Sequence, residues 1–192
     1  MELSAAEKNI LLKAARDSIK SVFGEAEKPV IDYEKYPLLK VKAGAFVTLT
    51  IQNELRGCIG YIIAEDNLFD TICDAAKQAA FRDPRFYPLS YPELNHIEIE
   101  ISVLSEPKNI DSYNEIEIGK HGLILTHFGR RGLLLPQVAT ENKFNLENFL
   151  CAICEKAGFE PFLWQREKLN IQVFTAEIFS EVGEREKSYV PN

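Results

Sequence analysis

The sequence predicts an α+β fold with a largely antiparallel sheet flanked by helices. Residues 45–51 and 55–63 have the alternation of strands, and a plausible turn at Asn53-Glu54 joins them into a hairpin. Residues 123–135 suggest a second hairpin, whose turn is expected at 128–132. Strands that are joined by hairpins, with only a few helices between them, favour an antiparallel sheet over a doubly wound parallel one.

The first helix is expected to begin after a capping box, Ser4-Ala5-Ala6-Glu7. In this box Ser4 accepts a bond from a backbone amide and Glu7 reaches back to the start of the helix. Apolar residues then recur at helical spacing and stop at Gly24. Residues 25–42 are predicted to be irregular, with room for a short element around 36–39.

A second helix is expected over 67–81, with Asp66 as its N-cap and Arg82-Asp83-Pro84 at its end. Ser90-Tyr91-Pro92-Glu93 is another capping box, with a proline early in a short helix. Residues 96–104 alternate cleanly between apolar and polar side chains, which predicts a strand.

The C-terminal third is predicted to hold one helix and one strand besides the second hairpin. Asn145 caps the helix, and Lys156-Ala157-Gly158 ends it. Residues 171–179 form the last predicted strand. The chain has 192 residues and no stretch typical of a linker, so one domain over 1–192 is expected.

Composition narrows the class of partner and the compartment. The formal net charge of −7 disfavours general binding to nucleic acids or anionic membranes. No secretory signal is expected at the N-terminus, and the longest uncharged run, 43–53, is shorter than the roughly 20 apolar residues of a membrane span. Four cysteines are too few for a disulfide scaffold, so reduced thiols in the cytoplasm are expected.

The hexapeptide Leu55-Arg56-Gly57-Cys58-Ile59-Gly60 is the first candidate site. Gly57 and Gly60 permit close backbone approach and can free amides to bind an anion or ligand. On a strand Arg56 and Cys58 share a face, and a nearby guanidinium favours the nucleophilic thiolate. The alternative is a tight strand with a small buried cysteine and an arginine held in an ion pair.

A general base for Cys58 is also present in the sequence. His121 can take this role, oriented by Glu98 or Glu100 on the polar face of the predicted strand at 96–104, as in a Cys-His-acid arrangement. The alternative is that His121 is a loop residue that is hydrogen-bonded to backbone.

Two further blocks offer polar groups to a ligand. Arg82, Asp83 and Arg85 can clamp a carboxylate or phosphate. The structural alternative is that Asp83 caps the turn and pairs with one arginine while Phe86 anchors the loop. Gln137 can offer a donor and an acceptor at a strand end, or it can satisfy amides at a helix start.

No metal site is expected. Cys151 lies well inside the helix that Asn145 caps, so the pair Cys151 and Cys154 is interpreted as buried, reduced core thiols. Cys58 and Cys73 have no partners at the spacing of zinc ligands, and the three histidines lack a compact metal-binding spacing.

Several sequence blocks follow one another in a fixed order along the chain. They are LRGCIG (55–60), FRDPRFYPLSYPEL (81–94), EISVLSEP (100–107), HGLIL and GLLLPQVATE (between 121 and 141), and FLCAICEKAGF with Trp164. Together these blocks resemble the AMMECR domain family, also called AmmeMemoRadiSam system protein A; one departure is Phe144, where many relatives have tryptophan. This resemblance implies a fold of two lobes, the larger one holding both termini, with a cleft between them. It also implies association with Memo-like and radical S-adenosylmethionine proteins, but no established activity and no known cofactor.

Two classes of function follow. In the first, the chain is an enzyme that acts on a small anionic substrate or a protein group in a cleft. Arg56, Cys58, the loop 82–86 and Gln137 are expected to converge on one wall of that cleft. In the second, the same surface binds a partner protein without catalysis.

Overall fold

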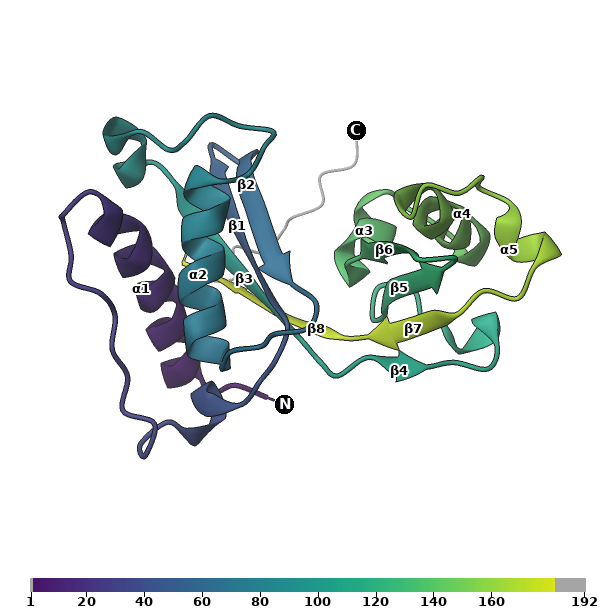
Figure 1. The fold of residues 1–192 in the computed structure, drawn as a ribbon, viewed down its shortest axis with the longest axis horizontal. Helices are drawn as coiled ribbons and strands as arrows, with labels where there is room; N and C mark the ends of the chain where they lie inside the picture. The colour runs from purple at the N-terminus through teal and green to yellow at the C-terminus, as the bar shows by residue number, and fades with distance from the viewer. Residues whose placement is uncertain (1, 182–192) are drawn as a thin grey trace. The chain divides into compact units, whose positions relative to one another are not determined.

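The structure is a computed structural model, and it describes residues 2–181 (Figure 1). The chain forms two compact units. Among the described residues the large unit comprises 2–103 together with 177–181, and the small unit comprises 104–176. No helix among the described residues has the length and apolar character needed to span a membrane. One domain over 1–192 and a cleft stay predictions.

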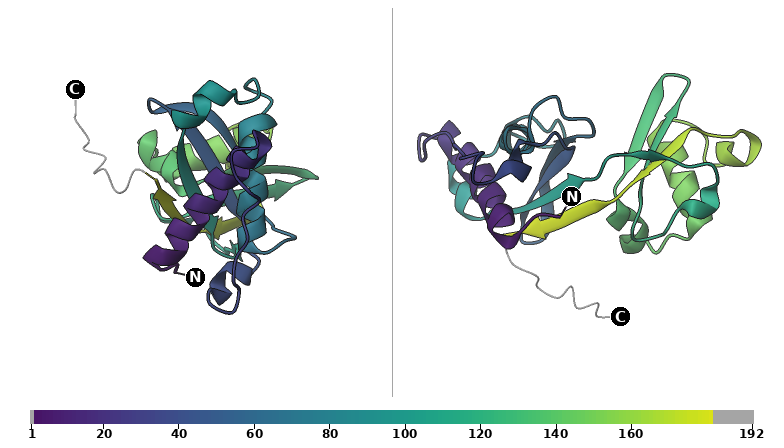
Figure 2. Two further views of the ribbon diagram at one scale, coloured as in Figure 1. Left: turned by 90° about the vertical axis from the view of Figure 1, so that its left-hand side faces the viewer. Right: turned by 90° about the horizontal axis from the view of Figure 1, so that it is seen from below.

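The α+β fold is confirmed, but with two sheets of four strands in place of one sheet. The sheet of the large unit has the order β2-β1-β3-β8, and that of the small unit β4-β7-β5-β6 (Figures 1 and 2). The strands of the large unit are β1 Ala45–Ile51, β2 Glu54–Tyr61, β3 Glu98–Leu104 and β8 Ala176–Ser180. Those of the small unit are β4 Lys108–Asn109, β5 Gly122–His127, β6 Arg130–Leu134 and β7 Ile171–Phe174.

Helices cover one face of the large unit's sheet. The long helices α1 (Ala5–Val22) and α2 (Leu68–Phe81) pack on each other, and α2 packs on β1 and β2 (Figure 1). Val47 and Leu49 of β1 are fully buried, whereas Thr48 between them is only partly buried. The sheet therefore has an apolar face on the helices and a more polar opposite face. The remaining helices are η1 Pro37–Lys40, η2 Tyr91–Asn95, η3 Tyr113–Glu115, α3 Pro136–Glu141, α4 Leu146–Lys156 and α5 Leu163–Arg166.

The turn of the first hairpin is shifted by one residue from the predicted Asn53-Glu54, and the turn of the second hairpin is shorter than predicted. Gln52 and Asn53 have φ of 54° and 66°, so they form the turn, and β2 begins at Glu54. In the small unit the turn is Phe128-Gly129, with φ of 43° and 74°, in place of 128–132. A two-residue turn with both residues in the left-handed conformation matches the right-handed twist of the two strands that it joins.

The strand predicted over 171–179 is interrupted at Thr175. Ser105 donates to the Thr175 carbonyl over 2.8 Å, and the Thr175 amide donates to Ser105 Oγ over 2.9 Å. At this point the chain leaves the sheet of the small unit as β7 and enters that of the large unit as β8. The alternation of apolar and polar residues shifts by one position at Val173 and Phe174, which are both buried, but this shift does not reveal that the partner strands change.

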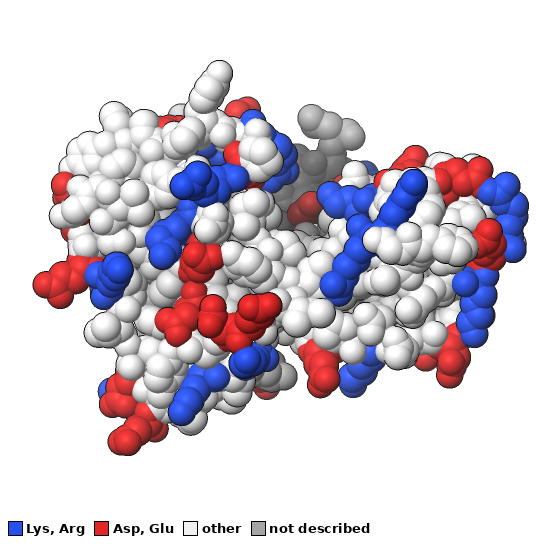
Figure 3. All heavy atoms as spheres, in the orientation of Figure 1, with Lys and Arg blue, Asp and Glu red and all other residues white. Residues whose placement is uncertain are grey.

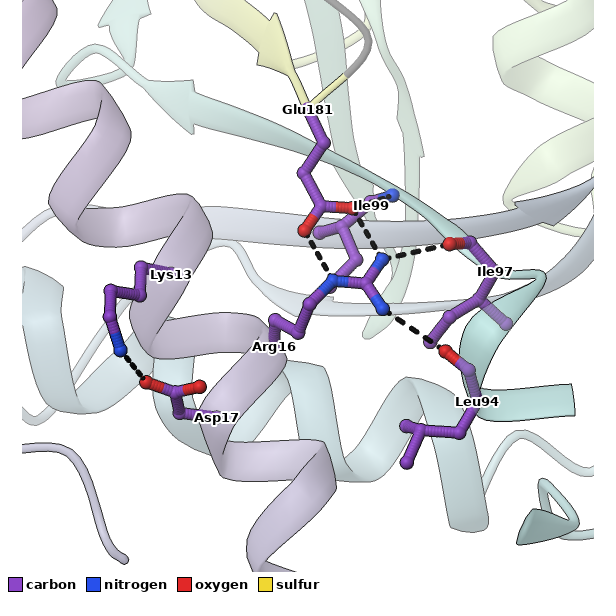
Figure 4. A network of polar contacts seen from close by, with 7 residues as sticks. All are labelled: Lys13, Arg16, Asp17, Leu94, Ile97, Ile99 and Glu181. Carbon is purple, nitrogen blue, oxygen red and sulfur yellow. Dashed lines mark hydrogen bonds and ion pairs between the residues drawn. The ribbon is translucent and has the colours of Figure 1, made fainter. Parts of the chain in front are cut away.

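Arg16 of α1 joins three segments of the large unit (Figure 4). Its guanidinium donates to the Leu94 carbonyl over 3.1 Å and to the Ile97 carbonyl over 2.8 Å, and it pairs with Glu181. Glu181 also accepts from the Ile99 amide over 3.1 Å. One side chain thus fixes α1 to the start of β3 and to the residue that follows β8.

The helix α2 is capped by Asn67, not by Asp66 as predicted. The Asn67 side chain accepts from the Asp70 amide over 2.9 Å. Asn67→Ala is therefore expected to lower the free energy of unfolding by about 1 kcal/mol. Asp66→Ala is the matched control and should change it by less than about 0.5 kcal/mol, because Asp66 is exposed. Urea unfolding followed by circular dichroism measures both, and equal losses would contradict the assignment.

Candidate functional site

Cys58 lies in a row of three polar side chains across the large unit's sheet. In the strand register Cys58 of β2 faces Thr48 of β1, and Thr48 faces Glu100 of β3. The Thr48 hydroxyl donates to Cys58 Sγ over 3.3 Å. All three side chains are partly exposed, on the face that the helices do not cover. Two of the predicted catalytic residues therefore share one surface, with Thr48 between them.

The two glycines that flank Cys58 allow close packing. A Cβ atom on Gly57 would lie 2.2 Å from the Ala79 carbonyl oxygen of α2. One on Gly60 would lie 2.5 Å from the ring of Phe46, its cross-strand neighbour in β1. Packing therefore accounts for both glycines, while amides offered to a ligand stay a prediction.

A buried carboxylate holds the Cys58 backbone in place. Asp83 accepts from the Cys58 amide over 2.9 Å and binds the Arg85 guanidinium through both oxygens, over 2.7 and 3.0 Å. The side chain of Asp83 is only 2% exposed, and that of Arg85 is 53% exposed. The hydrogen bond from Arg85 holds the pKa of Asp83 well below its usual range, although burial opposes the shift.

A second bidentate ion pair joins Arg56 to Glu93. The guanidinium donates to the two carboxylate oxygens over 2.7 and 3.1 Å. This bond lowers the pKa of Glu93 to about 2 against the opposing effect of burial. The ring of Phe86 lies near both guanidiniums, 5.9 Å from Arg56 and 5.4 Å from Arg85. Arg56 and Arg85 are thus both paired with carboxylates.

The loop 82–86 also covers the edge of the sheet. Because β2 is an edge strand, the outward amide of Cys58 would otherwise be open to another strand. Asp83 occupies that amide, and an Arg85 Nη atom lies 3.5 Å from the Cys58 carbonyl oxygen. The structural interpretation of Asp83 and Phe86 fits this geometry. Arg82 is exposed and has no ion-pair partner among residues 2–181.

Two predicted site residues belong to the small unit. The His121 Nδ1 atom accepts from the Glu117 amide over 3.1 Å, which places the proton of the neutral ring on Nε2. Gln137 is the second residue of α3, and its buried Oε1 atom has no hydrogen-bond partner among the described residues. Convergence of either residue with Cys58 stays a prediction.

Of the two cysteines that were predicted to be buried in α4, Cys151 and Cys154, only Cys154 is buried. Cys154 is fully buried, and burial raises the pKa of its thiol. Cys151 is partly exposed. Trp164 Nε1 donates to Cys151 Sγ over 3.4 Å. Within residues 2–181 no group of three or more His, Cys, Asp or Glu side chains could hold a metal ion.

Sequence reasoning missed Thr48 and Glu93. Thr48 could not be placed from the turn alone, since a regular hairpin with its turn at 52–53 pairs it with Gly57, and the register shift between Leu49 and Thr50 brings it opposite Cys58. Glu93 was identified only as a capping residue, and it does accept from the Ser90 amide over 2.8 Å. Its second role as the partner of Arg56 has no local signal, because 37 positions separate the two residues.

Comparisons with known proteins agree with this fold and these motifs. The chain is 42% identical over 184 residues to a protein of Sulfolobus acidocaldarius, covering 90% of this chain and 81% of that one. It is 40% identical to Protein Mbar_A1807 of Methanosarcina barkeri, covering 93% and 92%. The crystal structure of the uncharacterized protein PH0010 from Pyrococcus horikoshii is similar, with a TM-score of 0.82, 36% identity and 91% of both chains covered. The AMMECR1 family model matches residues 12–179, and the chain therefore belongs to the AMMECR1 family.

Proposed function

We propose that the chain is a thiol-dependent enzyme in which Cys58 is the nucleophile. The observation that supports this most directly is the partly exposed Cys58 thiol with the Thr48 hydroxyl 3.3 Å from its sulfur. The Asp83–Arg85 pair fixes the backbone at Cys58, so the sulfur is held in one position on the polar face of the sheet. A fixed nucleophile with a hydrogen-bond donor beside it is what covalent catalysis requires.

The row of side chains supplies a route for the proton. When the thiol loses its proton, the Thr48 hydroxyl donates to the anionic sulfur and stabilises it. We propose Glu100, the next side chain along the row, as the acceptor of that proton. The sulfur then forms a bond to an electrophilic carbon of the substrate. The bond from that carbon to the leaving group breaks, and the leaving group departs with the proton.

The local charges favour a neutral electrophile, such as an acyl group on a protein, over a small anion. Glu93 neutralises Arg56 and Asp83 neutralises Arg85, so neither of these guanidiniums offers an uncompensated positive charge to an anion. On the face of the molecule seen in Figure 3, acidic and basic side chains are interspersed. We place the activity in the cytoplasm, where thiols stay reduced.

Alkylation rates of the individual cysteines, read by peptide mass spectrometry, test this proposal. We expect iodoacetamide to modify Cys58 faster than the partly exposed Cys151 of the same molecule. Thr48→Val should slow Cys58 about fivefold, the equivalent of one hydrogen bond of about 1 kcal/mol, whereas Thr48→Ser should keep the native rate. Iodoacetate is an anion, and it should not modify Cys58 faster than the neutral iodoacetamide, because the nearby arginines are paired with carboxylates. A rate at Cys58 as low as that of buried Cys154 would refute the nucleophile.

The second candidate function is that of a non-catalytic partner of Memo-like and radical S-adenosylmethionine proteins. Tyr87 favours this binding function, because its ring is 90% exposed on a loop that is held at both ends. Asp83 fixes one end, and Leu89 is buried with its amide bonded to the Ala80 carbonyl over 2.8 Å. If Tyr87→Ala abolishes binding to such a partner protein while Cys58→Ser binds it normally, the result would support this function over catalysis.

A further inference from the structure

The turn of the β5–β6 hairpin contains a residue that does not suit the turn. Phe128 has a φ of 43° and its side chain is 83% exposed. The first position of such a turn normally holds asparagine, aspartate or glycine, because they adopt positive φ at little cost. An exposed phenylalanine gains little from its own unit in return. A residue that breaks both rules at a fixed hairpin tip is typical of a binding contact.

The tip is held firmly on the small unit. The His127 ring lies 4.3 Å from the Phe128 ring and 5.4 Å from that of Phe159. His127 Nε2 lies 3.1 Å from a carboxylate oxygen of Glu167. Arg130, just after the turn, donates to the Gly158 carbonyl over 2.6 Å. Phe128 is thus presented in one orientation, which reduces the entropy lost when it binds.

A pocket of the small unit is linked to this tip by Glu167, which lines the pocket and whose carboxylate lies beside His127 at the base of the turn. The pocket has a volume of about 410 Å³, enough for an aromatic ring. Its walls are fixed to each other, since the Leu169 amide donates to the Tyr113 hydroxyl over 2.9 Å and Tyr113 packs edge-on against Trp164. Ile110 adds apolar surface, and the rim carries Asp111, Glu167 and Lys168.

We propose that Phe128 of one copy of this chain inserts into the pocket of a second copy, and that the small units thereby form a weak symmetric dimer. Tip and pocket are neighbours on one unit, so a single twofold contact can make the exchange in both directions. The charges match as well. Arg131 beside the tip and Asp111 on the rim both lack an ion-pair partner among the described residues, so each can pair with the other copy.

Sedimentation velocity and tryptophan emission over a range of concentrations test the dimer. We expect the mass to rise from 21.8 kDa toward twice that value. Trp164 is the sole tryptophan, so its emission should shift to the blue in the same range as the pocket closes over it. Phe128→Asn should abolish both changes. Tyr87→Ala, which removes an exposed ring from the large unit, is the matched control and should abolish neither. A chain that stays monomeric at every concentration would overturn the proposal.

A melting measurement and a charge exchange separate a contact between copies from a role in folding. As a dilute monomer, Phe128→Asn should melt about 2 to 4 °C higher than the native chain, because asparagine relieves the strain of the turn. A fall of similar size would mean that Phe128 serves its own unit, and the proposal would fail. Arg131→Glu and Asp111→Arg should each weaken the dimer, and the double variant should restore it. If the double variant dimerises as weakly as the single variants, the proposed pairing of Arg131 with Asp111 of the other copy would be wrong.

Discussion

Gly57→Ala is expected to lower the free energy of unfolding of the large unit by about 3 kcal/mol. The added Cβ atom would lie 2.2 Å from the Ala79 carbonyl oxygen, far inside van der Waals contact. The obstructing atom is backbone in α2, so no side-chain rotation can relieve the clash. Relief requires that β2 and α2 move apart, and this movement would disturb the buried layer between them.

A control in the same unit isolates the steric part of this loss. Gly24 has a φ of 77°, but no atom lies within 4 Å of a Cβ built there. Gly24→Ala should therefore show only the conformational cost, about 1 kcal/mol. Urea unfolding followed by circular dichroism is the suitable measurement, since α1 and α2 are the longest helices. Two variants of equal stability would contradict the close approach at Gly57.

Tryptophan emission in the same experiment reports on the small unit alone, because Trp164 lies there. If the units unfold separately, Gly57→Ala should shift the circular dichroism transition and leave that of Trp164 in place. A shared shift would instead indicate that the two units unfold together.

The elements of the fold could be predicted wherever their signals are local. The capping boxes at Ser4 and Ser90 and the cap at Asn145 each begin a helix in the structure. The β4 strand has two residues and exists only through its pairing with β7, so it has no periodicity to detect. At Thr175 the chain changes its partner strands, and the adjacent buried residues Val173 and Phe174 do not show which strand comes next. In both cases the decisive information lies in the partner strand.

In the candidate site, too, features with a local sequence signal could be predicted and features that depend on distant residues could not. Arg56 and Cys58 were grouped because they share a strand, whereas Thr48 lies opposite Cys58 only through the register shift between Leu49 and Thr50. The bond between Asp83 and the Cys58 amide spans 25 positions and depends on the path of a loop, which no spacing predicts. For the same reason the sequence showed Arg56 as a cation available to the thiol, whereas Glu93 binds it in the structure.

Asp83→Asn is expected to lower the free energy of unfolding by about 2 kcal/mol at neutral pH. The Asp83 carboxylate accepts hydrogen bonds from the Cys58 amide and from the Arg85 amide and guanidinium. An amide side chain has one acceptor atom, so its NH₂ group would face donors. The Cys58 amide or Arg85 would then lose its partner. Arg85 is half exposed and can turn to water, which limits the loss.

The same variant should change how stability depends on pH, and the sign follows from the lowered pKa of Asp83. A carboxylate whose pKa falls on folding contributes stability that is present above its unfolded pKa of about 4 and is lost as the pH falls through its folded pKa. As the pH falls below about 4, the free energy of unfolding of the native chain should therefore decrease more steeply than that of Asp83→Asn. The difference in free energy of unfolding between the two proteins should narrow. Glu93→Gln should remove a separate part of this dependence, between about pH 4 and the folded pKa of about 2.

Urea titrations at a series of pH values from neutral to acid measure the narrowing directly. Asp66→Asn is the matched control, because Asp66 is an exposed carboxylate at the start of α2, and its curve should follow that of the native chain. Parallel curves for Asp83→Asn and the native chain down to low pH would contradict a lowered pKa at Asp83. They would imply that Arg85 is bound to water and not to Asp83. The loop 82–86 would then not be fixed to β2, and the rigid Cys58 backbone on which the proposed chemistry depends would lose its support.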